Sequence, residues 1–241
     1  MNTELYTPLK FDTELFGFKV AKLARCLSIP QLKAALLELK SRHFSLAYWQ
    51  TARSATTQYA EQSTSALLAS EQMIFRQDLS IQKLQEDSEP INYYPKAKPT
   101  PEMEDLALQI GALSRFGRDP NFTLEAWQLM YRTWITNATL QTVADATFIQ
   151  LDSETQKIIG MIVLKITGGK CGEIVLLAVA PTARGKGVGT KLIKQALCYF
   201  NEQKCQTAQV VTQKTNLPAC ALYQKCGFTL QNCDHFYHFW L

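Results

Sequence analysis

Apolar residues recur along the second half of the chain with two periods, which predict alternating helices and strands. Between Gly187 and Gln203 they fall three and four positions apart, so this segment is expected to be a helix with one buried face. Strands are expected at Val143–Leu151, Lys157–Ile166, Glu173–Ala180, Ala208–Thr212, Phe228–Leu230 and Phe236–Trp240. Further helices are expected at Glu102–Leu113, Thr123–Ala138 and Pro218–Cys226. The pattern predicts a mixed sheet flanked by helices.

The first half shows the same alternation on a smaller scale. Strands are expected at Phe18–Ala24, Leu46–Trp49 and Met73–Ile81, with helices at Gln31–Ser41 and Ala55–Ser70. The order β-α-β-α-β predicts a small α/β unit.

A break in the pattern separates the two halves. Residues 85–101 read QEDSEPINYYPKAKPTP, which is rich in proline and charge and has no apolar period. We therefore expect a linker here, with a smaller N-terminal α/β domain over residues 1–90 and a larger domain over residues 91–241.

Composition and charge exclude several classes of protein. Hydrophobic residues make up 46% and charged residues 19%, which indicates a soluble globular protein rather than a disordered one. The net charge of +4 comes from scattered basic residues, so no nucleic-acid partner is expected. A weak positive charge suits a small polyanion such as CoA or a nucleotide sugar, or simply a solvated surface.

Neither a signal-peptide pattern nor an apolar stretch of membrane-spanning length is found, so a cytoplasmic protein is expected. The seven cysteines include no C-x-x-C pair, which indicates reduced thiols rather than disulfides or a zinc site. His235 and His238 lie three positions apart on an expected strand. Their side chains should point to opposite faces, so no metal is expected.

The segment 177–190, LAVAPTARGKGVGT, has the features of an anion-binding turn. An apolar strand ends at Pro181, Arg184, Gly187 and Gly189 follow with the spacing R-x-x-G-x-G, and a helix begins at once. Glycines let backbone N–H groups approach an oxyanion, and a helix N-terminus adds partial positive charge. A pyrophosphate is the natural ligand, although a plain glycine-rich turn has the same spacing. The dinucleotide fingerprint G-x-G-x-x-G does not fit.

A second motif, NLPACALYQKCGF at residues 216–228, places Asn216, Ala219, Tyr223 and Gly227 in the pattern N-x-x-A-x-x-x-Y-x-x-x-G-F. Together with the preceding turn it closely resembles the GNAT superfamily of acetyl-CoA-dependent N-acetyltransferases, over about the last 140 residues. On residues alone, Tyr223 could also be a packed helix aromatic.

The resemblance implies acetyl-CoA as co-substrate and assigns the residues that would hold it. The strand at Leu177, Ala178 and Val179 would offer backbone groups to pantetheine. The pyrophosphate would be wrapped by Arg184, Gly185, Lys186, Gly187, Val188, Gly189 and Thr190. Asn216 would bond pantetheine or its neighbouring backbone, and Tyr223 would lie near the thioester sulfur.

Acetyl transfer to an amine needs an oxyanion donor, an acid and a base. The backbone N–H of Val179 is a candidate donor, and Tyr223 is protonated at neutral pH and can protonate the leaving thiolate. Glu173 is the candidate base, because its place in EIVLLAV resembles that of the catalytic glutamate of histone-acetylating members. A solvated Glu173 with a water chain as base is the alternative.

A looser resemblance concerns the acceptor. The runs FDTELFGFKVAKL from Phe11, LSRFGRD from Leu113, YRTWITNA from Tyr131 and FYHFWL at the end resemble the TDP-fucosamine acetyltransferase family. That family acetylates the 4-amine of a dTDP-linked 4-amino-4,6-dideoxygalactose in surface-polysaccharide synthesis. The resemblance makes Phe16 and Arg115 candidate acceptor residues, whereas Gly17 suits a tight turn and Arg115 could instead bridge to Asp119.

Three functions remain open from the sequence. The first is a nucleotide-sugar amine acetyltransferase with a small-molecule acceptor, and the second acetylates a protein amine or a small polyamine. The third is a non-catalytic acyl-CoA-binding module, against which Tyr223 and Asn216 speak. A homodimer is also left open.

Overall fold

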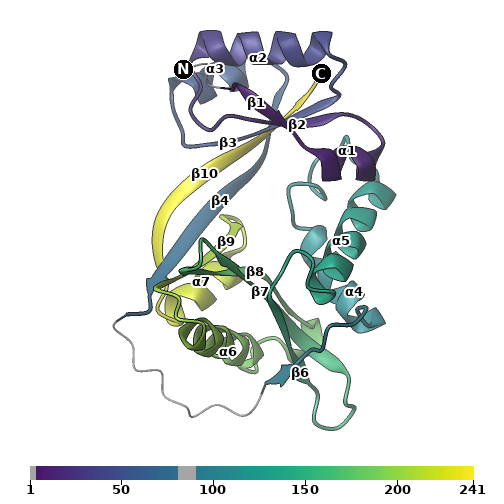
Figure 1. Ribbon diagram of the computed structural model, residues 1–241, viewed down its shortest axis with the longest axis vertical. Helices are drawn as coiled ribbons and strands as arrows, with labels where there is room; N and C mark the ends of the chain where they lie inside the picture. The colour runs from purple at the N-terminus through teal and green to yellow at the C-terminus, as the bar shows by residue number, and fades with distance from the viewer. Residues whose placement is uncertain (1–3, 81–90) are drawn as a thin grey trace.

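The computed structural model describes residues 4–80 and 91–241, which form one large mixed sheet with helices on both faces (Figure 1). The strands are β1 (Tyr6–Pro8), β2 (Val20–Leu23), β3 (Leu46–Thr51), β4 (Ala66–Asp78), β5 (Asn92–Tyr93), β6 (Ala146–Leu151), β7 (Ile158–Thr167), β8 (Cys171–Val179), β9 (Thr207–Gln213) and β10 (Thr229–Trp240). The helices are α1 (Lys10–Phe16), α2 (Ile29–Ser41), α3 (Ala55–Ser63), α4 (Pro101–Gly111), α5 (Leu124–Thr139), α6 (Val188–Glu202) and α7 (Leu217–Lys225), with a 3-10 turn η1 (Pro181–Ala183). The expected α/β architecture is confirmed.

Several helices begin at polar residues that act as N-caps. The Ser28 hydroxyl accepts the Gln31 N–H, and the Gln31 side-chain oxygen accepts the Ser28 N–H, which starts α2. The Thr123 hydroxyl accepts the Ala126 N–H at the start of α5. Because these bonds satisfy first-turn donors, they fix where each helix begins.

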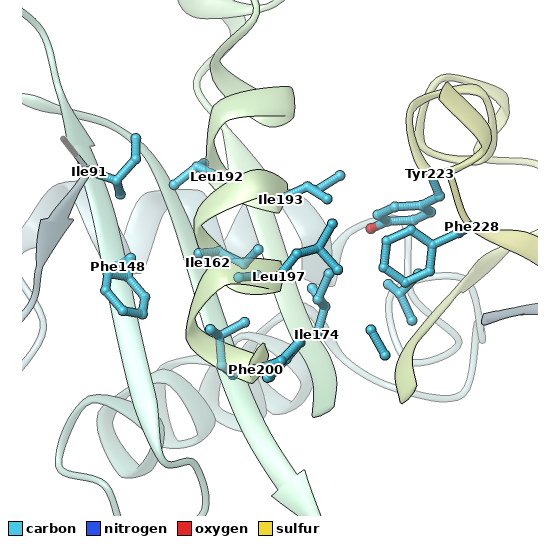
Figure 2. Packing of buried hydrophobic residues seen from close by; sticks show 14 of the residues in the cluster. Ile91, Phe148, Ile162, Ile174, Leu192, Ile193, Leu197, Phe200, Tyr223 and Phe228 are labelled. Atoms are coloured by element: carbon cyan, nitrogen blue, oxygen red, sulfur yellow. The ribbon is translucent and has the colours of Figure 1, made fainter. Parts of the chain in front are cut away.

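Helix α6 lies on one face of the sheet and provides the centre of the largest core (Figure 2). Leu192, Ile193 and Phe200 of α6 are fully buried there, as the apolar period of the sequence predicts. The close approach depends on Gly172 of β8, where an added Cβ would lie 2.3 Å from the Phe200 ring. On the opposite face, α4 and α5 bury Met103 and other apolar residues against β7 and β8.

The two halves of the chain interlock within the sheet. Its strand order is β1-β2-β3-β10-β4-β9-β8-β7-β6-β5, so the C-terminal strand β10 lies between two N-terminal strands. In turn, β4 of the N-terminal half pairs with β9 of the other half. Figure 1 shows β4 and β10 running side by side through the middle of the molecule. The expected boundary near residue 90 falls at the edge of the undescribed residues 81–90 and stays a prediction.

Three expected elements, one helix and two strands, were wrong in extent. The helix expected over Ala55–Ser70 ends at Ser63, because β4 begins at Ala66 and pairs there with Phe239 of β10. The two short strands expected after Phe228 are one strand of 12 residues, since β10 has a partner on each side for much of its length. Both outcomes depend on pairing between strands that are distant in sequence. A local sequence pattern does not reveal such pairing.

In the part of the chain that the structure describes, no helix is long and apolar enough to cross a membrane, and no group of three or more His, Cys, Asp or Glu could hold a metal ion. His235 lies 3.7 Å from Glu71, whereas His238 contacts Asp119. The two histidines therefore have separate partners.

Candidate active site

The strands β8 and β9 pair at their beginnings and then separate. Their parallel pairing runs from Cys171–Thr207 to Ile174–Val210, although β8 continues to Val179. Val175 is an extra residue in the pairing of β8 with β7, because Ile174 and Leu176 face consecutive residues of β7. The bulge and the early end of pairing leave the β9 side of Leu177–Val179 without a strand partner among the described residues.

The turn after β8 presents backbone donors in the way expected for an anion site. Gly185 and Gly187 have φ values of 75° and 83°, which glycine adopts without steric cost. Gly187 is the N-cap of α6 and has no side chain to bond the first-turn N–H groups. The helix N-terminus therefore directs unpaired donors and partial positive charge into the turn.

Arg184 is held at the mouth of this turn. Its Nε donates to the Val179 carbonyl at 3.2 Å and its Nη2 to Gln109 of α4 at 3.3 Å. Both bonds are to neutral acceptors, and no carboxylate of the described residues forms a salt bridge with the guanidinium, whose charge adds to the positive potential of the site.

A third glycine brings α7 close to the turn. An added Cβ at Gly189 would lie 2.8 Å from Leu222 of α7. Asn216 caps α7, since its Oδ1 accepts the Ala219 N–H at 3.3 Å. The motif residues Gly189 and Asn216 thus set the distance and direction of α7 relative to α6.

Helix α7 positions Tyr223. The side chain is 5% exposed and packs beside Phe75 and Phe228, with ring centroids 6.0 and 6.1 Å away. Figure 2 shows its hydroxyl directed towards the side of α6, away from the α7 backbone. Burial raises the pKa of Tyr223 well above its usual value, so the hydroxyl keeps its proton at neutral pH.

A single cleft of about 1000 Å³ connects these features. Most of the expected site residues line it: Leu177, Ala178, Val179, Arg184, Gly185, Gly187, Val188, Gly189, Thr190, Asn216, Tyr223 and Arg115. Lys186, Glu173 and Phe16 are not among its lining residues. The cleft is large enough for a drug-sized ligand.

Glu173 lies near the start of β8, opposite Lys165 of β7 and Gln209 of β9. Residues 173 and 179 are separated by roughly 20 Å along a strand that rises about 3.3 Å per residue. Although the next residue, Ile174, lines the cleft, Glu173 does not, and its role as a base stays a prediction.

Phe16 packs inside an aromatic cluster. Its ring lies 5.6 Å from Phe18, 4.9 Å from Phe122 and 6.0 Å from Phe116, between centroids. The following Gly17 has a φ of 75° and ends α1, as the tight-turn interpretation expected. Phe16 thus joins the N-terminal half to the loop before α5.

Arg115 is surrounded by aromatic rings and bonded to a histidine. Its guanidinium carbon lies 3.9 to 4.2 Å from the ring centroids of Phe116, Tyr48 and Phe236. Its Nη1 lies 3.0 Å from Nε2 of His238, so the expected direct bridge to Asp119 is replaced by a bridge through this histidine.

The cleft lining also includes residues absent from the sequence-based set, among them Asp12 of α1, and Tyr131 and Trp134 of α5. Asp12 lies inside the run FDTELFGFKVAKL and Tyr131 begins YRTWITNA, so both runs were noticed without these side chains being singled out. No local pattern distinguishes them from packed or solvated residues.

Comparisons with known proteins agree with this geometry. Residues 113–228 match the model of the acetyltransferase (GNAT) family. Streptothricin acetyltransferase of Escherichia coli is 40% identical over 81 residues, which are 34% of this chain and 47% of that protein. The spore coat polysaccharide biosynthesis protein SpsD of Bacillus subtilis (strain 168) is 26% identical over 146 residues, 61% of this chain and 49% of SpsD. The chain thus spans about half the length of these relatives.

Solved structures support the fold over nearly the whole chain. A functionally unknown conserved protein from Staphylococcus epidermidis superposes with a TM-score of 0.66 at 9% identity, covering 100% of this chain and 92% of the other. A tandem GNAT protein from the clavulanic acid biosynthesis pathway gives 0.61 at 12% identity, covering 91% and 74%. At such low identity these likenesses concern the fold alone.

Proposed function

We propose that the chain, whose residues 113–228 match the GNAT acetyltransferase family model, transfers an acetyl group from acetyl-CoA to a primary amine of a dTDP-linked amino-dideoxy sugar. The observation that carries the transfer is one cleft that combines the glycine turn, the unpaired edge of β8 and Tyr223. Acetyl-CoA supplies the activated thioester.

The residues of the cleft fit acetyl-CoA by their chemistry. The N–H groups between Gly185 and Thr190 suit the pyrophosphate, with Arg184 as the nearby cation. Pantetheine carries amide groups, and the backbone of Leu177–Val179 has no β9 partner, so the two can pair as one strand pairs with another. Asn216 lies at the start of α7, where its amide nitrogen remains available for a pantetheine carbonyl.

Two groups of the chain would assist the chemical step. A backbone N–H of β8, with Val179 as the candidate, donates to the developing oxyanion. Tyr223 donates its proton to the leaving thiolate. Apolar surroundings raise the pKa of Tyr223, which keeps its proton in place until the thiolate leaves, and they also increase the proton affinity of that thiolate.

The proposed acceptor is inferred from the end of the cleft around Arg115, which we call the acceptor end. Arg115, Phe11 and Tyr131 line it, and the Arg115 guanidinium contacts His238 and Tyr48 with only part of its five N–H donors, which leaves others for a phosphate or a sugar oxygen. SpsD, named for polysaccharide biosynthesis, resembles more of this chain than the family model covers. A nucleoside diphosphate carrying a sugar has both the negative charge and the length that this end can use.

Other amines are the second candidate. Short stretches of the chain are also similar to mycothiol acetyltransferases and to N-alpha-acetyltransferase 30 of Xenopus laevis, proteins named for quite different acceptors. Because proteins with such different acceptors are similar to this chain, the similarity supports acetyl transfer but does not identify the acceptor. The acceptor must be inferred from the rest of the cleft.

The test is an acceptor panel with the full chain and acetyl-CoA, measured by CoA thiol release and by the mass of the product. The panel contains dTDP- and UDP-linked amino sugars, spermidine and a peptide with a free N-terminus, with the corresponding hydroxyl sugars as controls. We expect acetylation of a dTDP-amino sugar and none of its hydroxyl analogue. Acetylation of spermidine or the peptide alone would replace the sugar as acceptor, and failure to bind CoA in calorimetry would overturn the proposal.

A further inference from the structure

The charged side chains of the cleft are almost all cations. Arg115, Arg118, Arg184 and Lys225 line it, and among its described lining residues the one carboxylate is Asp12. Neither Glu nor His lines it in the described part of the chain. An amine acceptor enters as an ammonium ion at neutral pH, so it needs a site of opposite charge and a group that takes its proton.

Asp12 reaches the cleft from the N-terminal half. It lies in the first turn of α1, which packs against α5, and its neighbour Phe11 also lines the cleft. The side chain is half-buried and forms no salt bridge with a described residue. Arg115 and Tyr48 lower its pKa, but burial outweighs them, so the charge of Asp12 is only partly compensated by its neighbours.

The neighbours of Asp12 stabilise its charge without forming a salt bridge with it among the described residues. Arg115, from the loop before α5, is near enough to stabilise its charge, but Arg115 hydrogen-bonds His238 instead. Tyr48 of β3 is 1% exposed, and its hydroxyl lies close enough to Asp12 to lower the pKa of that carboxyl, although it forms no well-aligned hydrogen bond with a described residue. Tyr131 of α5 faces Arg115 as well. An acceptor nitrogen beside Asp12 would complete the compensation of its charge.

We propose that Asp12 binds the ammonium group of the acceptor and takes its proton, so that the N-terminal half supplies the base of the reaction. The inference rests on the proposed acetyl transfer. It differs from the sequence-based expectation, because Glu173 does not line the cleft. Burial raises the pKa of Asp12 despite the opposing charge of Arg115, which makes this carboxylate a stronger base than an exposed aspartate.

The proton balance is simple. The ammonium gives one proton to the Asp12 carboxylate and becomes a neutral amine, whose lone pair forms the N–C bond. The C–S bond breaks and its electron pair stays on sulfur, which takes a proton from Tyr223. The second proton lost by the nitrogen returns the phenol of Tyr223 to its neutral form through solvent, and Asp12 releases its proton to solvent.

The first test compares Asp12→Asn with Glu14→Gln, using the acceptor that the wild-type chain acetylates. The asparagine keeps the size of the side chain but carries no charge and takes no proton. Glu14 lies on the same helix with a side chain 66% exposed, next to Lys10, so it serves as the matched control. We expect Asp12→Asn to lower kcat/KM for the amine by about 10²- to 10⁴-fold and to flatten its rise with pH, with CoA affinity unchanged in calorimetry.

Glu173→Gln decides between the two candidate bases. If it removes the rise of kcat/KM with pH while Asp12→Asn keeps it, Asp12 is not the base. A second measurement separates binding from chemistry: the affinities of a dTDP-amino sugar and its hydroxyl analogue, with CoA present. We expect the wild type to prefer the amine and Asp12→Asn to lose that preference; an equal preference in both proteins overturns the ammonium site.

Failure of this inference can be told apart from failure of the proposed acceptor. If the wild type binds neither sugar but acetylates spermidine or a peptide, the sugar is wrong, and Asp12→Asn is measured with that amine. If Asp12→Asn then retains full kcat/KM for it, the role of Asp12 is wrong as well.

Discussion

His238 Nδ1 lies 2.6 Å from Asp119 Oδ2, and both side chains are completely buried. The other ring nitrogen lies 3.0 Å from Arg115. A guanidinium only donates hydrogen bonds, so Nε2 of His238 must accept and Nδ1 must carry the proton that Asp119 receives. The neutral imidazole therefore bridges Asp119 and Arg115 by two hydrogen bonds. This bridge orients the guanidinium at the cleft.

This arrangement predicts an unusual titration of His238. Burial is the main cause that lowers its pKa to about 4, and the charge of Arg115 acts in the same direction. In the unfolded chain the ring is protonated below about pH 6.5, whereas in the folded chain it is protonated only below about pH 4. The contribution of this residue to the free energy of unfolding is therefore present above pH 6.5 and is lost as the pH falls towards 4. The loss amounts to roughly 3 kcal/mol for a shift of this size.

NMR titration of the three histidine rings, together with chemical denaturation at several pH values, checks this expectation. His238 should titrate near pH 4 and the free energy of unfolding should fall between pH 6.5 and 4. A His238 midpoint near 6.5 would show that the ring is not held as the neutral acceptor of Arg115.

The glycine turn gives a prediction with a matched control. Gly187→Asp would place a carboxylate beside the bound pyrophosphate, and we expect a loss of CoA affinity of at least about tenfold. Gly168 also has a positive φ, of 60°, and like Gly187 has nothing within 4 Å of an added Cβ. Gly168→Asp should therefore carry a similar backbone strain, of about 1–2 kcal/mol, without affecting CoA.

Calorimetric titration with CoA and thermal unfolding of both variants make the comparison. Equal CoA affinity in the two folded variants would mean that the turn at Gly187 does not hold the phosphates. Equal thermal destabilisation with unequal CoA affinity is the expected result.

The interlocked strands predict how the chain responds to a cut. A specific protease site placed between residues 85 and 90 would separate two pieces in sequence, but β10 would still pair with β3 and β4, and β9 with β4. We expect the pieces to co-elute in gel filtration and to bind CoA. A C-terminal piece that elutes alone and still binds CoA would instead support the independent domain expected from the sequence.

Much of the geometry at the end of the cleft that we propose to bind CoA could be predicted from the sequence, because its determinants are local. The turn at Gly187 and the cap at Asn216 depend on residues within a few positions of each other, and the apolar period of α6 identifies its buried face. The acceptor end could not be predicted in the same way. Arg115 and His238 are 123 positions apart, and Asp12 lies on a helix of seven residues with no fully buried side chain to reveal it.

The last prediction concerns Tyr223, which is proposed to protonate the thiolate only after the N–C bond forms. Tyr223→Phe keeps the ring beside Phe75 and Phe228 and removes only the hydroxyl. An interaction made mainly in the transition state lowers kcat with little change in the KM for acetyl-CoA, and general-acid contributions are about 10²- to 10⁴-fold. We expect a loss of kcat in that range, measured with the acceptor that the panel identifies.

Tyr199→Phe is the control, because Tyr199 lies on α6 and is not among the described residues that line the cleft. It should leave both kcat and CoA affinity unchanged. If Tyr223→Phe instead lowers CoA affinity while kcat holds, the hydroxyl serves binding and the acid must come from elsewhere. A loss of only two- or threefold in kcat would mean that water can protonate the thiolate. In that case the Tyr223 hydroxyl, whose pKa is raised by burial, does not lie within hydrogen-bond reach of the sulfur in the transition state.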